Sequence, residues 1–191
     1  MRELGEKLDK RGFSSCFLQA EEDLLDILDK EIPKTKTIAF GGSKTLEELG
    51  LYEFFQKRGN KVNWHWRGDN LKVSDKADIY FSSANAVTLD GDLYFVDGNG
   101  NRLRNLTSEK EIYIICGRNK LVEDREAAVK RVEKIAGPLN AKRLNLKTPC
   151  SKTGKCEDCK HPDRICNYYL WISRARHKNI KLIFIGGNYG Y

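Results

Sequence analysis

Apolar residues recur along this chain with two different periods. Apolar side chains three or four positions apart, as in amphipathic helices, occupy four segments: residues 2–11, 21–30, 46–57 and 122–136. Short apolar runs typical of strands lie between and beyond them, at residues 37–40, 61–66, 77–83, 111–116 and 181–185. Helices and strands that alternate in this way favour an α/β fold, in which helices cover a largely parallel sheet.

Two turn signals refine this pattern. The pair Asp90-Gly91 separates two apolar runs and predicts a β-hairpin over residues 86–96. The pair Gly137-Pro138 is expected to end the helix that precedes it. Neither repeats nor low-complexity tracts interrupt the chain, so we expect a single α/β domain over residues 1–191.

Four cysteines gather near the C-terminal end of the chain. They are spaced C-x5-C-x2-C-x6-C and are Cys150, Cys156, Cys159 and Cys166. The central C-x-x-C pair lets two thiolates bind one centre, and single flanking cysteines are more typical of iron–sulfur clusters than of structural zinc. We therefore expect a metal-binding segment at residues 145–170 that holds an iron–sulfur cluster, with zinc as the alternative and disulfides or free thiols as the third reading.

The surroundings of these cysteines lack helical or strand periodicity. We expect residues 145–166 to form a loop organised by metal, followed by a helix from Asp163 to about His177. His161 has the chemistry to replace one thiolate, although four thiolates already fill a tetrahedral site. The other two cysteines, Cys16 and Cys116, lie in apolar runs and are expected to be small buried side chains.

The N-terminus and the charge distribution limit where the protein works and what it binds. No secretion signal and no apolar run long enough to span a membrane are visible, so we expect a cytoplasmic protein whose thiols stay reduced. Residues 1–95 carry 14 basic and 17 acidic side chains, whereas residues 96–191 carry 20 and 10. Part of this basic excess lies among the cysteines and offsets thiolate charge, and part is expected on solvated helix faces, at Lys130, Arg131 and Lys134. No nucleic-acid-binding motif accompanies it, so nucleic acid is not an expected partner.

A glycine loop follows the predicted strand 37–40 and precedes a helix. It comprises Gly41, Gly42, Ser43, Lys44 and Thr45. Glycines let backbone N–H groups approach an anion, and Lys44 adds a positive charge, so this loop suits a phosphate or carboxylate. The alternative is an ordinary helix cap, in which the Ser43 or Thr45 hydroxyl accepts from the first amides.

Two further polar segments follow predicted strands, where α/β folds place ligand sites. Their candidate ligand-binding residues are Ser83, Asn85, Thr88, Asp97, Asn99, Asn101 and Arg102. Capping of strand ends explains the first three without a ligand, and a tight glycine turn explains most of the others. Arg102 is a candidate clamp for a carboxylate or phosphate, or else a solvated surface residue.

Catalytic groups are few. His65 lies between Trp64 and Trp66 in the predicted strand 61–66, so alternation is expected to point its imidazole to the face opposite both tryptophans. No nucleophile paired with a base is visible, and a hydrolytic mechanism is therefore not supported. The catalytic residues are left unassigned.

Three segments together resemble the LUD-domain family of lactate-utilisation proteins: GGSKTLEELGL, SSANAVTLDGDLYFVDGNGNR and GPLNAKRLNLKTPCSKTGKCEDCKHPDRICN. The resemblance covers nearly the whole chain and is greatest to small stand-alone members with a C-terminal cysteine segment. It implies a Rossmann-like three-layer α/β/α sandwich, similar to sugar-phosphate isomerases and CoA transferases. It also implies a part in the oxidation of lactate to pyruvate within a multi-subunit iron–sulfur system.

Three hypotheses about function follow. The first is a redox protein, or an oxidoreductase subunit in lactate oxidation, that binds an iron–sulfur cluster and a small hydroxy or keto carboxylate. Its expected partners are this anionic substrate, a redox protein and other lactate-utilisation subunits. The second is an isomerase- or transferase-like enzyme with a structural zinc and a phosphorylated or CoA-linked substrate. The third is a non-catalytic binding protein in which a metal stabilises a partner surface.

Overall fold

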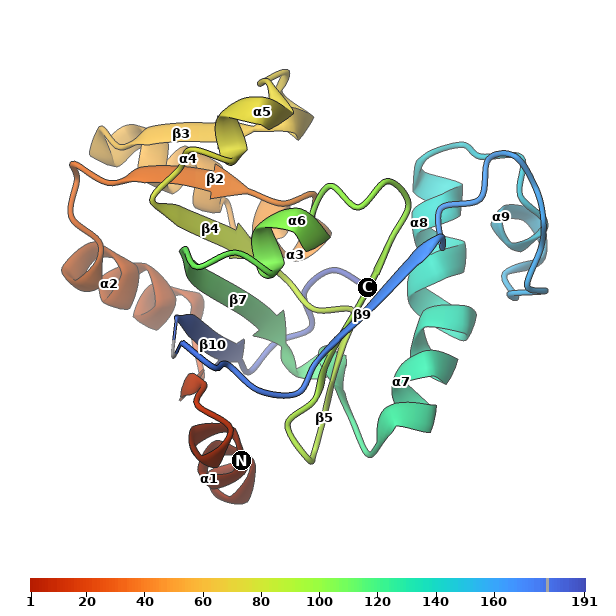
Figure 1. The fold of residues 1–191 in the computed structure, drawn as a ribbon, viewed down its shortest axis with the longest axis horizontal. Coiled ribbons are helices and arrows are strands. Elements are labelled where there is room, and N and C mark those ends of the chain that lie inside the picture. The colour runs from red at the N-terminus through yellow and green to blue at the C-terminus, as the bar shows by residue number, and fades with distance from the viewer. Residues whose placement is uncertain (178) are drawn as a thin grey trace.

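The structure, a computed structural model, describes residues 1–177 and 179–191 and contains two β-sheets with helices packed around them (Figure 1). The α-helices are α1 Arg2–Lys10, α2 Glu21–Glu31, α3 Lys44–Glu48, α4 Leu51–Arg58, α5 Leu71–Ser74, α6 Leu103–Leu106, α7 Arg125–Arg131, α8 Gly137–Arg143 and α9 Pro149–Thr153. Two 3-10 turns, η1 His65–Arg67 and η2 Arg118–Lys120, and one π-helical turn, η3 Val132–Ala136, join these elements. The strands are β1 Ser14–Leu18, β2 Thr37–Phe40, β3 Lys61–Trp64, β4 Ile79–Ser82, β5 Ala86–Thr88, β6 Leu93–Asp97, β7 Glu111–Gly117, β8 Leu121–Val122, β9 Tyr168–Ile172 and β10 Ile180–Ile185.

The larger sheet has six parallel strands in the order β1-β10-β7-β4-β2-β3. Its central strands are buried on both faces, as the continuous apolar run Ile112–Cys116 of β7 requires. Helices α2, α3 and α4 pack on one face around Leu28, Leu46 and Phe55. The predicted α/β class, with a mostly parallel sheet flanked by helices, is confirmed.

The smaller sheet covers the other face and has the order β8-β5-β6-β9. The predicted hairpin forms its centre, because β5 and β6 pair antiparallel with Val87 opposite Leu93. Strand β9 pairs with β6, and β8 pairs with β5. A second apolar cluster, which includes Tyr94 and Val132, joins this sheet to α7 and η3. Figure 1 shows α7 beside the smaller sheet. The hairpin therefore belongs to a whole second sheet, which periodicity did not predict.

Three predicted elements have different bounds in the structure. The helix predicted at 46–57 divides into α3 and α4, because Gly50 takes a left-handed conformation with φ of 59°. The strand predicted at 61–66 ends at Trp64, after which the chain turns through η1. The helix expected to end at Gly137-Pro138 continues as α8, since Pro138 is tolerated in its first turn.

The helix predicted from Asp163 to His177 is wrong. Residues 168–172 form strand β9, whose run Tyr-Tyr-Leu-Trp-Ile has the aromatic and branched side chains that suit a sheet. Leu170 and Ile172 pack into the core between the two sheets, and Trp171 stacks on Tyr94 with ring centroids 4.1 Å apart. Pairing with β6 overrides any local helical tendency of this segment.

Two further findings concern β1 and the helices. Strand β1, which periodicity did not predict, carries Cys16 half-buried at the sheet edge, whereas Cys116 is buried in β7 as expected. No helix in the described part of the chain is long and apolar enough to cross a membrane.

Candidate functional site

A cavity of about 210 Å³ lies at the carboxyl ends of the parallel strands. This is the edge at which α/β folds bind ligands. The cavity is lined by ten of the predicted ligand residues: Gly42, Ser43, Lys44, Thr45, Ser83, Asn85, Asp97, Asn99, Asn101 and Arg102. Gly41 and Thr88 are not among the lining residues. Thr88 instead lies in the hairpin, where its hydroxyl accepts from the Asp92 N–H at 3.0 Å.

The glycine loop is shaped by close packing. A side chain at Gly42 would place its Cβ 2.8 Å from Nε1 of Trp66, and one at Gly41 would lie 2.5 Å from the Tyr80 hydroxyl. Ser43 caps α3, because its hydroxyl accepts from the Leu46 N–H at 3.3 Å. The capping alternative is therefore seen in the structure, and it leaves Lys44 beside the cavity.

The loop after β6 is organised by Asp97. One carboxylate oxygen accepts from the N–H groups of Asn99 and Gly100, at 3.0 and 2.8 Å. The other accepts from Nε of Arg102 at 3.1 Å. Burial opposes ionisation of Asp97, but the Arg102 charge and these hydrogen bonds outweigh it, so the pKa of Asp97 lies below its ordinary value.

The guanidinium of Arg102 already makes hydrogen bonds within the protein. Besides Asp97, its guanidinium donates to the carbonyl oxygen of Val96 and lies 3.4 Å from the Asn85 side-chain oxygen. Because these bonds use much of its donor fork, Arg102 is fixed in place and contributes mainly charge to the cavity. Arg102 therefore has few N–H groups left with which to bind a carboxylate or phosphate at two points, as the predicted clamp role requires.

Positive charge dominates the cavity wall. Its lining has four basic side chains against the single carboxylate of Asp97, and they are Lys44, Arg102, Lys120 and Arg143. Lys44 pairs with Glu47 at 2.6 Å, outside the lining. Arg143 stacks over the Trp66 ring at 4.4 Å from its centroid. A site with this balance favours an anionic ligand.

His65 reaches the cavity because the chain turns at η1. Trp64 and Trp66 stack with their ring centroids 5.4 Å apart, so the two tryptophans lie on one side, as alternation predicted, although the strand itself ends at Trp64. Burial lowers the pKa of His65, which keeps the imidazole neutral at neutral pH. Within the described residues, its buried Nδ1 has no hydrogen-bond partner.

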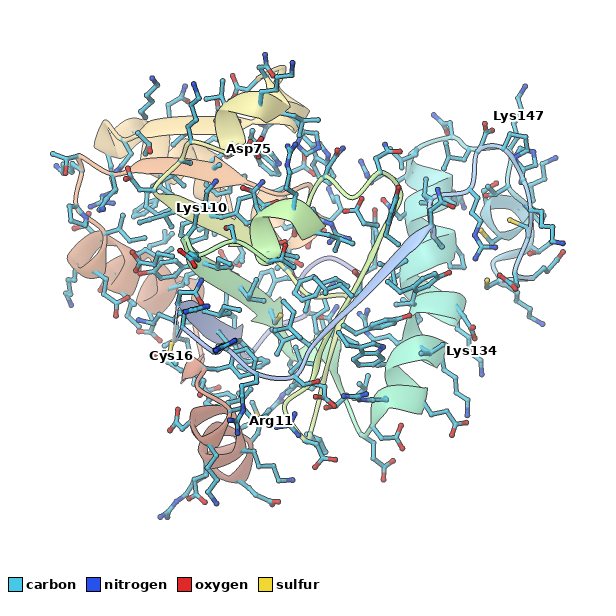
Figure 2. All side chains as sticks on the ribbon, viewed as in Figure 1. Arg11, Cys16, Asp75, Lys110, Lys134 and Lys147 are labelled. Carbon is cyan, nitrogen blue, oxygen red and sulfur yellow. The ribbon has the colours of Figure 1, made fainter. Side chains whose placement is uncertain are left out.

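Two basic residues lie deeper. Lys120 is 2% exposed and donates to the main-chain oxygen of Tyr191. Arg131, expected on a solvated face, is buried and donates to the carbonyl oxygens of Asn119 and Asn85 at 2.8 and 2.7 Å. Lys134, one turn further on, is exposed and points outward (Figure 2). Helical periodicity alone did not distinguish the buried Arg131 from the exposed Lys134, because the π turn η3 shifts the helical register between these two positions.

The opposite side of the cavity is formed by η3, by α8 and by the end of the cysteine segment. Figure 2 shows the outer edge of this segment, where Lys147 is labelled. The Cys156 N–H donates to the Glu133 carbonyl in η3 at 3.1 Å, and Ile165 and Cys166 line the cavity. One of the four cysteines therefore borders the same space as the glycine loop.

The local geometry around Cys156 resembles a thiolate-binding turn. Asp158 has a left-handed φ of 45°, and its N–H points to Sγ of Cys156 at 3.4 Å. Arg164 joins the ends of the segment, because its guanidinium bonds to the Asp158 carboxylate at 2.8 Å and to the Cys166 carbonyl at 3.0 Å. Turns with N–H groups directed at sulfur suit bound thiolates.

The four thiols do not yet form a ready metal site. Within residues 1–177 and 179–191, no three His, Cys, Asp or Glu side chains converge in a way that could hold a metal ion. Burial, followed by the charge of Cys156, raises the pKa of Cys166 to about 11, so its thiol is protonated at neutral pH. The donor chemistry fits a thiolate-bound centre, but the segment must close further for four sulfurs to share one.

Sequence reasoning missed several lining residues, notably Lys120, Asn140, Arg143 and Tyr191. Lys120 had a usable signal, since it follows the apolar strand β7 and therefore lies at the ligand-binding edge of the sheet. Tyr191 had none, because only the fold brings its hydroxyl within 2.7 Å of Arg143.

Parallel strands with a cavity at their carboxyl ends define an α/β protein of the Rossmann-like kind. The profile of the LUD domain matches residues 1–185, and the chain belongs to the LUD-domain family. No curated protein matches the chain.

Two solved structures are similar to this one. A DUF162 family protein from Deinococcus radiodurans aligns over 97% of this chain and 95% of its own, with a TM-score of 0.58 and 11% identity, and it shares the fold. Ribose 5-phosphate isomerase from Plasmodium falciparum aligns over 54% of this chain and 52% of its own, with a TM-score of 0.30 and 17% identity. An overlap that small says nothing about the reaction of this chain.

Proposed function

We propose that this LUD-domain protein binds a small hydroxy or keto carboxylate in the cavity and acts as a redox protein or subunit in lactate utilisation. The observation that carries the proposal is the cavity itself, in which four basic side chains accompany one carboxylate and Cys166 forms part of the wall. Family membership supports lactate or pyruvate as the first ligands to try.

An iron–sulfur cluster, or zinc as the alternative, would be held by Cys150, Cys156, Cys159 and Cys166. A cluster supplies one-electron transfer when bound. The protein's own contribution is to hold the carboxylate with Lys44 and Arg143 and to hold Arg102 in place through Asp97. The neutral imidazole of His65 is placed to exchange a proton with a bound hydroxyl or carbonyl group.

The first experiment tests the redox part of this proposal. Metal and acid-labile sulfide are measured, with an absorption spectrum, on protein purified without oxygen and on the variant Cys156→Ser/Cys159→Ser. We expect iron with matching sulfide and a brown chromophore, both lost in the variant. Colourless protein with one zinc per chain would contradict the redox role.

Ligand binding is measured separately by calorimetry with L-lactate, pyruvate, a sugar phosphate and coenzyme A. We expect pyruvate or lactate to bind, and Lys44→Ala to weaken binding by about fivefold or more, since each such contact is worth about 1 kcal/mol. Lys147→Ala, at the outer edge of the cysteine segment, is the matched control and should change nothing (Figure 2).

One observation favours a second function. Lys44, Arg102 and Arg143 supply more positive charge than a single carboxylate needs, which favours a phosphorylated or CoA-linked ligand and an isomerase- or transferase-like reaction with a structural zinc. Tight binding of the sugar phosphate or coenzyme A, with no binding of pyruvate or lactate, would select this function.

A further inference from the structure

Arg143, the last residue of α8, differs in its partners from other basic side chains of the cavity. Lys44 pairs with Glu47 at 2.6 Å. Arg102 pairs with Asp97 at 3.1 Å. In the described part of the chain, Arg143 bonds only to uncharged side chains and forms no ion pair with an Asp or Glu. Its positive charge is therefore available to an anion that enters the cavity.

Hydrogen bonds along one edge fix the guanidinium of Arg143. Its Nε and Nη2 groups donate to Oδ1 of Asn140, one turn earlier on α8, at 3.1 and 2.8 Å. Nε also donates to the Tyr191 hydroxyl at 2.7 Å, and that hydroxyl donates to the same Asn140 oxygen. Among the described residues, the Nη1 group has no hydrogen-bond partner. Arg143 thus keeps the edge formed by Nη1 and Nη2 for a ligand.

The ring of Trp66 supports this guanidinium. Arg143 lies over the ring, 4.4 Å from its centroid. The same ring stacks on the buried Trp64, with centroids 5.4 Å apart and 15° between the planes. Gly42 leaves room for it, since a Cβ there would lie 2.8 Å from Nε1 of Trp66. The glycine loop therefore acts on Arg143 through the position of Trp66.

We propose that Arg143 binds the anionic group of the ligand at two points, through Nη1 and Nη2, and that Gly42, Trp66 and Asn140 are its positioning residues. This inference rests on the proposed function, in which the anionic group is the carboxylate of a small hydroxy or keto acid. A guanidinium fork matches the two oxygens of a carboxylate, whereas an ammonium group binds them as a point charge. The fork makes Arg143 a specificity-determining residue, which selects a carboxylate over a neutral amide of the same shape.

The test is calorimetry on the whole chain with pyruvate and with pyruvamide, its neutral amide. We expect the wild type to bind pyruvate at least about tenfold more tightly than pyruvamide, because only pyruvate offers a carboxylate. Arg143→Lys keeps the charge but not the fork, so pyruvate should bind at least about tenfold more weakly and pyruvamide less than about threefold more weakly. Lys142→Ala, at an exposed neighbour that does not line the cavity, is the matched control and should change neither.

A double-mutant cycle tests the positioning residues. Asn140→Ala and Gly42→Ala should each weaken pyruvate binding by about threefold to tenfold, since the first releases the guanidinium and the second displaces the ring beneath it. In the Arg143→Lys background, neither substitution should weaken pyruvate binding further, because both act through that side chain. Losses that add in full to that of Arg143→Lys would overturn the positioning role.

The remaining outcomes separate this inference from the proposed function. Pyruvate that binds Arg143→Lys as tightly as the wild type, or equal losses for pyruvate and pyruvamide, would overturn the role of Arg143 and leave the carboxylate site standing. Pyruvate that does not bind the wild type would overturn the proposed function. A sugar phosphate that then binds, and binds more weakly to Arg143→Lys, would still support the anion contact; failure of both ligands would overturn both claims. Arg143 is exposed, so its substitution leaves the core intact.

Discussion

The two sides of the cavity are held in different ways. The side formed by the parallel sheet follows strands whose apolar residues are buried on both faces, and the glycine loop is fixed by contact with Trp66 and Tyr80. The side formed by the cysteine segment is largely exposed and depends on single hydrogen bonds, such as that from Cys156 to Glu133. Core packing thus fixes the glycine loop, whereas local polar contacts leave the cysteine segment able to respond to what it binds.

The largest difference in the free energy of unfolding should come from two substitutions that each remove an aromatic ring, one on each side of the cavity. Phe81 is buried in β4 and stacks on Tyr113 with ring centroids 4.9 Å apart. Phe81→Ala should lower the free energy of unfolding by about 3–5 kcal/mol, because it leaves a cavity in the core. Tyr168→Ala, at a side chain 52% exposed beside the cysteine segment, should change it by less than about 0.5 kcal/mol. Denaturant titration measures both, and similar losses would show that the two sides are equally well packed.

A smaller effect on the free energy of unfolding is expected at the contact between the smaller sheet and α7. Asp92, in the hairpin, is buried and pairs with Arg11 and with Arg125 of α7, each at 2.7 Å. Figure 2 shows Arg11 at the base of the molecule, near α1. Asp92→Asn should cost about 2 kcal/mol, as for other hydrogen bonds to charged groups. Asp90→Asn, at an exposed carboxylate two residues earlier, is the control.

The same carboxylate gives a pH dependence with a definite sign. Burial opposes ionisation of Asp92, but the bond from Arg125 and the charge of Arg11 lower its pKa below the ordinary value. Its contribution is therefore complete above the unfolded pKa of about 4 and is lost as the pH falls through the lower folded pKa. Thermal unfolding of the wild type should lose this stability on acidification, and Asp92→Asn should lose less. Parallel curves for the two proteins would refute the assignment.

The smallest effect on global stability is expected for a substitution of Arg164. Its guanidinium joins Asp158, Cys166 and the Tyr169 hydroxyl, so Arg164→Ala should loosen the cysteine segment alone. We expect global stability to fall by about 1 kcal/mol or less, while proteolytic cleavage within residues 145–166 becomes faster. Lys152→Ala, in α9, is the control that should leave cleavage unchanged. Unchanged cleavage in Arg164→Ala would mean that other contacts hold the segment closed.

Sequence patterns predicted the elements that depend on local periodicity. Helices α1 and α2 and strands β2, β7 and β10 lie within one or two residues of the expected bounds. Strand β9 was not predicted, since its partner β6 lies about seventy residues away and pairing decides its conformation. The continuation of the helix past Gly137 was also not predicted, because a π turn beside a proline has no simple periodic signature.

The candidate site was predictable only in part, for the same physical reason. Ser83, directly after β4, was found because strand ends converge in parallel sheets. Arg102, which follows β6 of the smaller sheet, was found from the glycine turn beside it. Thr88 does not line the cavity, because it lies within the hairpin and away from that edge. Arg143 and Tyr191 come from elements brought together by long-range packing, which no local window contains.

The position of β10 has a consequence for how the chain folds as it is made. This strand comes last among those described, yet it lies between β1 and β7. Until residues 180–185 have left the ribosome, β1 has no place in the sheet and β7 keeps an open, apolar edge. Emerging chains therefore face a late and long-range closure step, at which strand edges are open to aggregation.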